Sequence, residues 1–282
     1  MRRNSLRVFY DAAGLFIFAV MVFPIYWMVT TALKPGKEIL SLDPYWFPAP
    51  VTFENFTSAM QVPFFWNDVV NSLTVVLTVV AISIIVSFLA AVAVARFGFR
   101  GRTAFIVMVI GVQMVPLNAL VIPIYLLLDS VNQVDSLLGV IAYYLAVVLP
   151  FMVWTLRGFV QNIPTDLEEA AMVDGASRVG AFMRIVFPLV APGLVATAIF
   201  GFIQAWNEYI IAYVLLSSSS KQTLTIWLAS FTTAHGTDWG GLMAGATLTS
   251  LPVVVFFLLV QRRVAGPLPV FRRFRASRRG ST

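Results

Sequence analysis

The polar residues best suited to bind a small solute lie within an apolar segment in the second half of the chain. Gln204, Asn207 and Glu208 carry hydrogen-bonding groups there, and Trp206 and Tyr209 place aromatic rings beside them. Binding sites for sugar rings combine such polar groups with aromatic faces. A carboxylate in an apolar span is costly, which makes Glu208 a functional candidate. The cluster predicts a carbohydrate path; the alternative is that Asn207 and Glu208 hydrogen-bond a neighbouring helix.

Two further polar residues lie in another apolar segment. Gln113 and Asn118 flank Pro116. They are candidates for a second wall of the same path. Alternatively, they satisfy backbone groups that the proline leaves without a partner.

The composition argues against catalysis by this chain. His235 is the only histidine and cysteine is absent, which excludes disulfides, cysteine metal sites and histidine clusters and leaves little apparatus for nucleophilic catalysis. Walker A, HExxH and GxSxG patterns do not occur. We therefore expect no catalytic residue, no metal site and no cofactor bound by this chain.

The elements that must position these residues are membrane helices. Hydrophobic residues make up 59% of the 282 residues and charged residues 11%, against roughly 25% charged residues in soluble domains. Six apolar segments are long enough to cross a bilayer as helices. They lie near residues 8–33, 69–95, 104–128, 137–156, 193–216 and 242–260. We expect an all-α membrane protein of one transmembrane domain, residues 1–282, with six transmembrane helices.

Basic residues orient these helices. With six spans, all sixteen arginines fall on the side that holds both termini, and the other side holds only Lys34, Lys37 and Lys221. Basic loops stay in the cytoplasm. We therefore expect a multi-pass protein of the plasma (inner) membrane with cytoplasmic N- and C-termini. Topology and anionic headgroups explain the basic tail, residues 261–282, so no nucleic-acid partner is expected.

A charged island between the fourth and fifth spans, residues 161–190, predicts two short cytoplasmic helices. Thr165 and Glu168 have the spacing of a capping box at the start of the first helix. Gly175 stands where a left-handed residue would end that helix, and Ser177 can cap a second helix that leads to span five. A short rigid helix with small alanine side chains can transmit force to a partner. The alternative is a solvated connector whose acidic residues favour the helix N-terminus.

The island resembles the EAA loop of the membrane permeases of binding-protein-dependent ABC importers. That pattern has Glu-Ala-Ala, three residues, Gly, nine residues, Ile, one residue and Leu-Pro, and here Phe187 replaces the leucine. The six-span layout and residues 204–209 are similar to carbohydrate-type permeases of this family. The resemblance makes the island the ATPase-coupling loop, with the candidate residues Glu168, Glu169, Ala170, Ala171, Asp174, Gly175, Arg178, Ile185 and Pro188.

The resemblance implies a permease subunit of an ATP-driven importer, for a sugar or oligosaccharide, that works by alternating access. The implied partners are a second, homologous permease, two ATPase subunits that carry ATP and Mg, an extracytoplasmic solute-binding protein and the lipid bilayer.

The outer loop of residues 34–68 is rich in proline and aromatic residues. It is a candidate landing surface for the binding protein, or an interfacial belt. We expect the serine-rich start of the second outer loop, residues 217–240, to be flexible.

Two other functions stay open. A permease of the same superfamily could carry another solute, such as amino acids, phosphate or metal ions. An ion-coupled secondary transporter would be expected to show repeated halves and midplane acidic residues. This chain shows no clear internal repeat, and Glu208 is its only central carboxylate.

Overall fold

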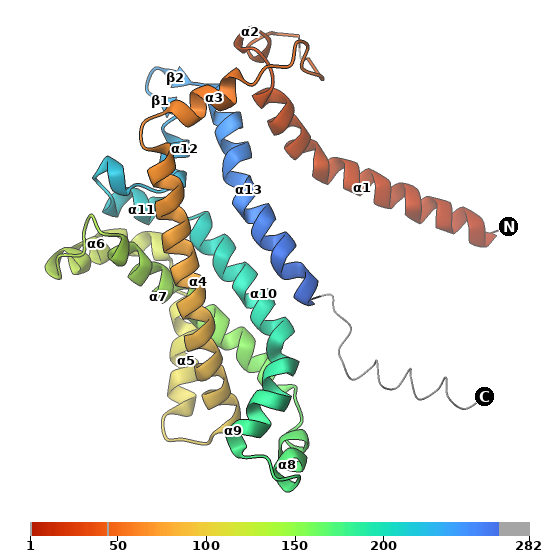
Figure 1. Cartoon of the computed structure of the whole chain (residues 1–282), viewed down its shortest axis with the longest axis vertical. Coiled ribbons are helices and arrows are strands. Elements are labelled where there is room, and N and C mark those ends of the chain that lie inside the picture. The colour runs from red at the N-terminus through yellow and green to blue at the C-terminus, as the bar shows by residue number, and fades with distance from the viewer. Residues whose placement is uncertain (1, 44, 265–282) are drawn as a thin grey trace. The chain divides into compact units, whose positions relative to one another are not determined.

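The computed structural model describes residues 2–43 and 45–264, and most of them form helices (Figure 1). The longer helices are α1 (Arg2–Ala32), α4 (Phe65–Arg96), α5 (Arg102–Gln113), α6 (Val121–Ser130), α7 (Leu137–Gln161), α10 (Phe187–Trp206) and α13 (Trp239–Val264). The shorter elements are α2 (Gly36–Ile39), α3 (Glu54–Gln61), the 3₁₀-helix η1 (Leu117–Leu120), α8 (Asp166–Val173), α9 (Arg178–Ala181), the π-helix η2 (Phe182–Val186), α11 (Ile210–Leu215), the 3₁₀-helix η3 (Ser219–Lys221), α12 (Leu224–Ala229), and the strands β1 (Thr232–Thr233) and β2 (Gly236–Thr237).

Among the described residues, five helices are long and apolar enough to cross a membrane. They are Phe9–Ala32, Phe65–Arg96, Leu137–Gln161, Arg178–Trp206 and Trp239–Gln261. They correspond to the first, second, fourth, fifth and sixth predicted spans. The basic tail beyond residue 264 lies outside the described residues.

The third predicted span, residues 104–128, is wrong as a continuous helix. It consists of α5 and α6, two shorter apolar helices joined through η1. Pro116 has an extended backbone (ψ 100°) between them. Proline lacks an N–H group and its ring clashes with the preceding turn, so a helix tends to break there.

The boundaries of the fifth predicted span, residues 193–216, are also wrong. The apolar helix already begins at Arg178 and runs to Trp206. α11 then forms a separate helix after Asn207–Tyr209. The predicted span therefore includes the break where three of the candidate solute-path residues lie.

The described residues divide into two compact units. One contains residues 2–69 and 224–251, and the other contains residues 70–223 and 252–264. The island of residues 161–190 and the polar cluster of residues 204–209 both belong to the second unit. Helices α5 to α11, which are labelled in Figure 1, are all part of this unit.

The core of the second unit lies where α4, α7 and α10 meet. α7 packs against both α5 and α10. A cluster of buried apolar residues joins the three helices beside the island, and its members are Phe88, Ala91, Leu156, Val160, Ile163, Val186, Val190 and Leu194. At Gly193 the backbone of α10 comes so close to α7 that an added Cβ would lie 2.5 Å from Cγ of Phe159. Small residues permit this close helix packing in membranes.

In the first unit, a buried lysine organises the chain after α1. Lys34 is 3% exposed; its ammonium donates to the carbonyl of Tyr45 and lies 4.3 Å from the ring centroid of Trp27. Burial lowers the pKa of Lys34, and the carboxylate of Glu38 partly opposes this shift. The amide of Asn55 donates to the Lys34 carbonyl at 2.8 Å. The loop of residues 34–68 is thus tied to the end of α1.

The close approach at Gly193 makes a stability prediction. Gly193→Ala should lower the Tm of the detergent-solubilised protein by roughly 2–10 °C, because overpacking a core costs about 1–3 kcal/mol. Gly158→Ala is the matched control in α7, since nothing lies within 4 Å of a Cβ added there. Equal Tm values for the two variants would contradict the close packing of α7 on α10.

Candidate coupling loop and solute path

Helix α8 forms the first half of the island, and it begins differently from the sequence expectation. Thr165 has a helical backbone conformation and makes no side-chain cap, so the predicted capping box is wrong. The carboxylate of Glu168 instead lies 2.8 Å from Nη2 of Arg96. A full charge of opposite sign competes better for this carboxylate than a neutral backbone N–H does.

The end of α8 is a Schellman turn at Gly175. The N–H of Gly175 donates to the carbonyl of Met172 at 3.1 Å, and the N–H of Ala176 donates to that of Ala171 at 3.0 Å. Gly175 has φ +90°, a conformation that costs glycine little and other residues much. The predicted helix end is confirmed.

The second half of the island leads directly into α10. Ser177 caps α9 as predicted, with its Oγ accepting from the N–H of Gly180 at 3.1 Å. The helix then passes through the π-turn η2, where Phe187 N–H donates to the carbonyl of Phe182. Pro188 explains this π-turn, because proline removes one helical hydrogen bond and its ring needs extra room in the preceding turn. Ile185 lies within η2.

The surface of α8 suits a protein partner. Glu169, Ala170 and Asp174 are exposed, while Ala171 is partly buried. Val173 is 88% exposed and Leu167 is exposed as well; the neighbouring helix α9 adds the exposed Val179. Apolar side chains grouped with charges on an exposed helix mark interaction sites.

The candidate solute path forms a cavity of about 260 Å³ between α7 and the end of α10. Gln204, Asn207 and Glu208 line it together with Tyr143 and Tyr144. The two tyrosines were not singled out from the sequence; two adjacent hydroxyl-bearing rings inside an apolar span were the available signal. The cavity offers hydrogen-bonding groups and aromatic faces.

Glu208 also holds the break between α10 and α11 in shape. Its carboxylate accepts from the N–H of Ile211 at 2.9 Å and from that of Ala212 at 3.1 Å, and the hydroxyl of Tyr144 donates to it at 2.8 Å. The first N–H groups of a helix have no partner within the helix, and Glu208 supplies one for α11. The alternative role of Glu208 expected from the sequence is a hydrogen bond to a neighbouring helix, and the bond from Tyr144 of α7 is such a contact.

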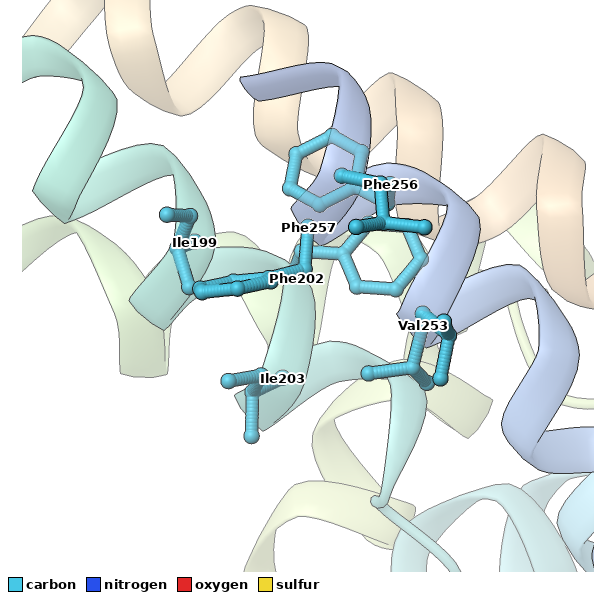
Figure 2. Close-up of a pocket in the computed structure, with 8 residues that line it drawn as sticks. Ile199, Phe202, Ile203, Val253, Phe256 and Phe257 are labelled. Carbon is cyan, nitrogen blue, oxygen red and sulfur yellow. The ribbon is translucent and has the colours of Figure 1, made fainter. Parts of the chain in front are cut away.

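Trp206 lies apart from the cavity. Its indole is 6% exposed and stacks on Phe202 at 5.5 Å between ring centroids. Phe202 stacks in turn on Phe256 of α13 at 4.1 Å. Both rings line an apolar pocket of about 220 Å³, and Figure 2 shows Phe202 and Phe256 among the residues around it. Trp206 therefore belongs to an aromatic stack between α10 and α13.

Of the remaining candidates, Tyr209 and Gln113 do not line this cavity. Tyr209 is exposed and lies 5.5 Å from Tyr213, ring to ring. The amide of Gln113 donates to the carbonyl of Val109 in its own helix at 3.1 Å. Asn118 belongs to η1, and its side chain lies outside the described part of the structure.

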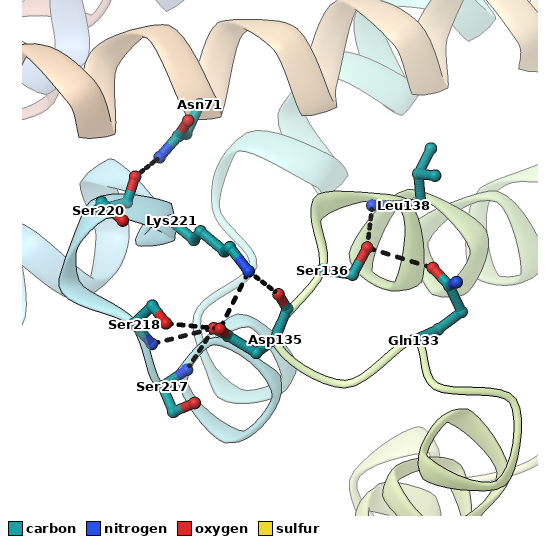
Figure 3. Close-up of polar contacts among 9 residues, drawn as sticks. All are labelled: Asn71, Gln133, Asp135, Ser136, Leu138, Ser217, Ser218, Ser220 and Lys221. Atoms are coloured by element: carbon teal, nitrogen blue, oxygen red, sulfur yellow. Dashed lines mark hydrogen bonds and ion pairs between the residues drawn. The ribbon is translucent and has the colours of Figure 1, made fainter.

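A charged cluster that sequence reasoning missed centres on Asp135 (Figure 3). Its carboxylate accepts from the N–H groups of Ser217 and Ser218 at 3.1 and 2.9 Å, from the Ser218 hydroxyl, and from the Lys221 ammonium at 3.1 Å. The amide of Asn71 holds the same segment through the carbonyl of Ser220 at 3.0 Å. The expectation of a flexible serine-rich segment is wrong, because these groups fix it.

The sequence matches a known family over residues 83–266. The family is described as "Binding-protein-dependent transport system inner membrane component". The chain belongs to this family. It is therefore a multi-pass membrane permease of a transport system rather than an enzyme.

The permease is similar to named relatives over most of its length. It is 42% identical to the diacetylchitobiose uptake system permease protein DasC of Streptomyces coelicolor, over 95% of this chain and 98% of the relative. It is 34% identical to the trehalose transport system permease protein SugB of Mycobacterium tuberculosis, over 87% and 89%. A solved chain of a bacterial ABC transporter involved in the import of the polysaccharide alginate has the same fold, with a TM-score of 0.77, 21% identity, and coverage of 93% of this chain and 98% of that one.

The Asp135 cluster makes the stability of the permease pH-dependent. Hydrogen bonds from Ser218, followed by the contact with Lys221, hold the pKa of Asp135 well below its usual range. The folded state thus favours the ionised form, so its stabilisation is complete above about pH 4, the usual pKa of aspartate, and is lost as the pH falls. We expect Asp135→Asn to lower the Tm of the solubilised permease at pH 7, and this difference from wild type to shrink towards pH 3.

Asp129→Asn is the matched control, since that residue is exposed nearby and lies outside the Asp135 cluster. A Tm difference for Asp135→Asn that stays constant from pH 7 to pH 3 would exclude the ionised carboxylate as its source.

Proposed function

We propose that this permease is a membrane subunit of an ATP-driven importer for a sugar or small oligosaccharide. The observation that carries the proposal is the 42% identity, over 95% of the chain, to a permease named for diacetylchitobiose uptake. A second relative is named for trehalose, so both named substrates are disaccharides. We expect ATP and Mg to bind a partner ATPase rather than this chain. Within residues 2–43 and 45–264, no group of three or more His, Cys, Asp or Glu residues could hold a metal ion.

In this proposal α8 is the element that docks on the ATPase. The exposed Glu169, Ala170 and Asp174 would face the partner, with Val173 as an apolar contact. Gly175 and the cap of Ser177 fix the direction of the chain into α10. A stiff connection is needed because a flexible loop would absorb the movement of the ATPase.

Transport would proceed by alternating access. ATP binding would move α8 with the ATPase, and the helix that runs from Arg178 to Trp206 would carry that movement towards the cavity beside Asn207. Rigid movement of packed helices, rather than bending within them, is the usual form of such transitions. A second, homologous permease and a second ATPase would complete the transporter.

The solute would arrive from a binding protein on the outer side. The family is binding-protein-dependent by description. Both termini and the island would lie in the cytoplasm, following the arginine distribution. The outer loop around Trp46 and Phe47, both exposed, would then receive the binding protein.

The cavity of Gln204, Asn207 and Glu208 would form part of the solute path. Gln204 and Asn207 are exposed at its edge and would contact sugar hydroxyl groups. The carboxylate of Glu208 would act mainly through the N–H groups of α11 that it binds. Tyr143 would add an aromatic face.

Co-purification tests the coupling role. Wild type expressed in its own host should bring down an ATPase, a second permease and a binding protein, whereas Glu169→Lys/Gly175→Pro should lose the ATPase. The charge reversal repels the ATPase surface that binds an acidic helix, and proline at a residue with φ +90° cannot keep the turn. Subunits would be identified by mass spectrometry and ATP hydrolysis assayed on the purified complex.

Glu54→Lys is the control, because Glu54 is an exposed acidic residue at the start of α3, outside the island. If the control keeps the ATPase and the double variant loses it, the role of α8 is supported. Wild type that purifies alone and moves solute with an ion gradient would overturn the importer proposal.

The solute path has its own test. Gln204→Leu in the complete transporter should raise the KM for labelled diacetylchitobiose or trehalose roughly three- to tenfold, the effect of one lost hydrogen bond. ATPase co-purification should stay unchanged. Gln222→Leu, which does not line the cavity, should leave the KM at the wild-type value; equal KM values for both variants would remove Gln204 from the path.

A further inference from the structure

Helix α8 lies at the surface of the second unit. None of its eight residues, all of which the structure describes, is fully buried. The elements on which it packs most are α9 and η2, which follow it in the chain. It reaches α4, which is distant in sequence, through the contact of Glu168.

Arg96, the last residue of α4, supplies the contact with Glu168. Its Nη2 lies 2.8 Å from Oε1 of Glu168 and also donates to the carbonyl of Ile163 at 2.9 Å. Both charged side chains are largely withdrawn from solvent, at 12% and 19% exposure. A single guanidinium thus joins α4 to α8 and to the residues just before α8.

The ion pair borders a cavity. A cavity of about 480 Å³ lies between the end of α4 and α8, and Arg96 and Glu168 both line it. The other lining residues of α4 are Leu89, Val92 and Ala93. The ion pair thus joins α4 and α8 directly beside this cavity.

Ile163 extends the connection into the core. It is 8% exposed and belongs to the apolar cluster that also contains Phe88 and Ala91 of α4. On the other side of the island, the ring of Phe182 lies 5.4 Å from that of Phe88. The end of α4 is therefore joined to the chain both before and after α8.

We propose that Arg96 is a positioning residue that couples α8 to α4, so that movement of α8 reaches the membrane helices through α4 as well as through α10. The inference rests on the proposed function of α8. α10 receives the movement through chain continuity, whereas α4 is distant in sequence and receives it through the guanidinium. Without Arg96, the ATPase would still bind α8, but its movement would reach the cavity less completely.

A labelling experiment on the complete transporter tests this role without knowledge of the solute. The chain contains no cysteine, so Asn207→Cys places one thiol at the edge of the cavity. The rate of its reaction with a soluble maleimide is measured with and without ATP and vanadate. In Arg96→Gln and Glu168→Gln we expect the ATP-dependent change in rate to fall roughly tenfold, within the range of coupling between sites, with the ATPase still co-purifying.

The charge-swapped pair Arg96→Glu/Glu168→Arg should recover most of the change, because the ion pair is restored. Arg100→Gln is the matched control: Arg100 is exposed in the loop that follows α4 and should behave as wild type. Arg96→Gln that behaves like this control, or that loses the ATPase altogether, would overturn the inference. So would a swapped pair no better than the single variants.

A covalent substitute covers the case in which Arg96→Gln fails to fold. Arg96→Cys/Glu168→Cys, built without the Asn207→Cys substitution and joined by a short bifunctional maleimide, should regain ATP-dependent uptake of labelled diacetylchitobiose or trehalose in the complete transporter, relative to the same variant before cross-linking. Cross-linking without any recovery would contradict the coupling. Wild type that fails to bind an ATPase would overturn the proposed function itself, a result distinct from all of these.

Discussion

The structure depends on one constraint, that backbone hydrogen-bonding groups within a membrane must find partners inside the protein. The long helices satisfy it locally, and each interruption needs a substitute. Between α10 and α11 the substitute is Glu208, whose carboxylate accepts from two N–H groups of α11 and from Tyr144. Before Pro188 it is a π-turn. The break beside Glu208 also borders the cavity, which Asn207 and Glu208 line.

Within the island of residues 161–190, local hydrogen bonds fix the turn between α8 and α9, whereas Ile163, Val186 and Val190 anchor its two ends in the apolar core. The Schellman turn at Gly175 and the cap of Ser177 satisfy the backbone at the two helix ends between α8 and α9. From Arg178 onward the chain continues as one helix to Trp206. A segment that is both exposed and stiff meets the two requirements of a coupling element, which are access for a partner and little loss of movement within itself.

Charged hydrogen bonds hold the loops at two places in the second unit. Arg96 ties α4 to the island, and Asp135 ties the residues before α7 to the serines after α11. Both sites lie at helix ends. There a charged group gains hydrogen bonds to backbone atoms without entering the apolar middle of a span, where it would be expensive. Such ties suit a transporter whose helices move as rigid elements between states.

The sequence by itself determined the features that depend on local pattern. Hydropathy gave the membrane class and most spans, and the spacing around Gly175 and Ser177 gave both helix ends of the island. The tertiary structure decided which partner each polar side chain takes. Glu168 leaves its predicted capping role for Arg96, Glu208 bonds Tyr144 at a separation of 64 residues, and Asp135 fixes serines 82 and 83 residues away. Local periodicity carries no information about such partners, because only the packing of distant helices brings these groups within hydrogen-bond distance.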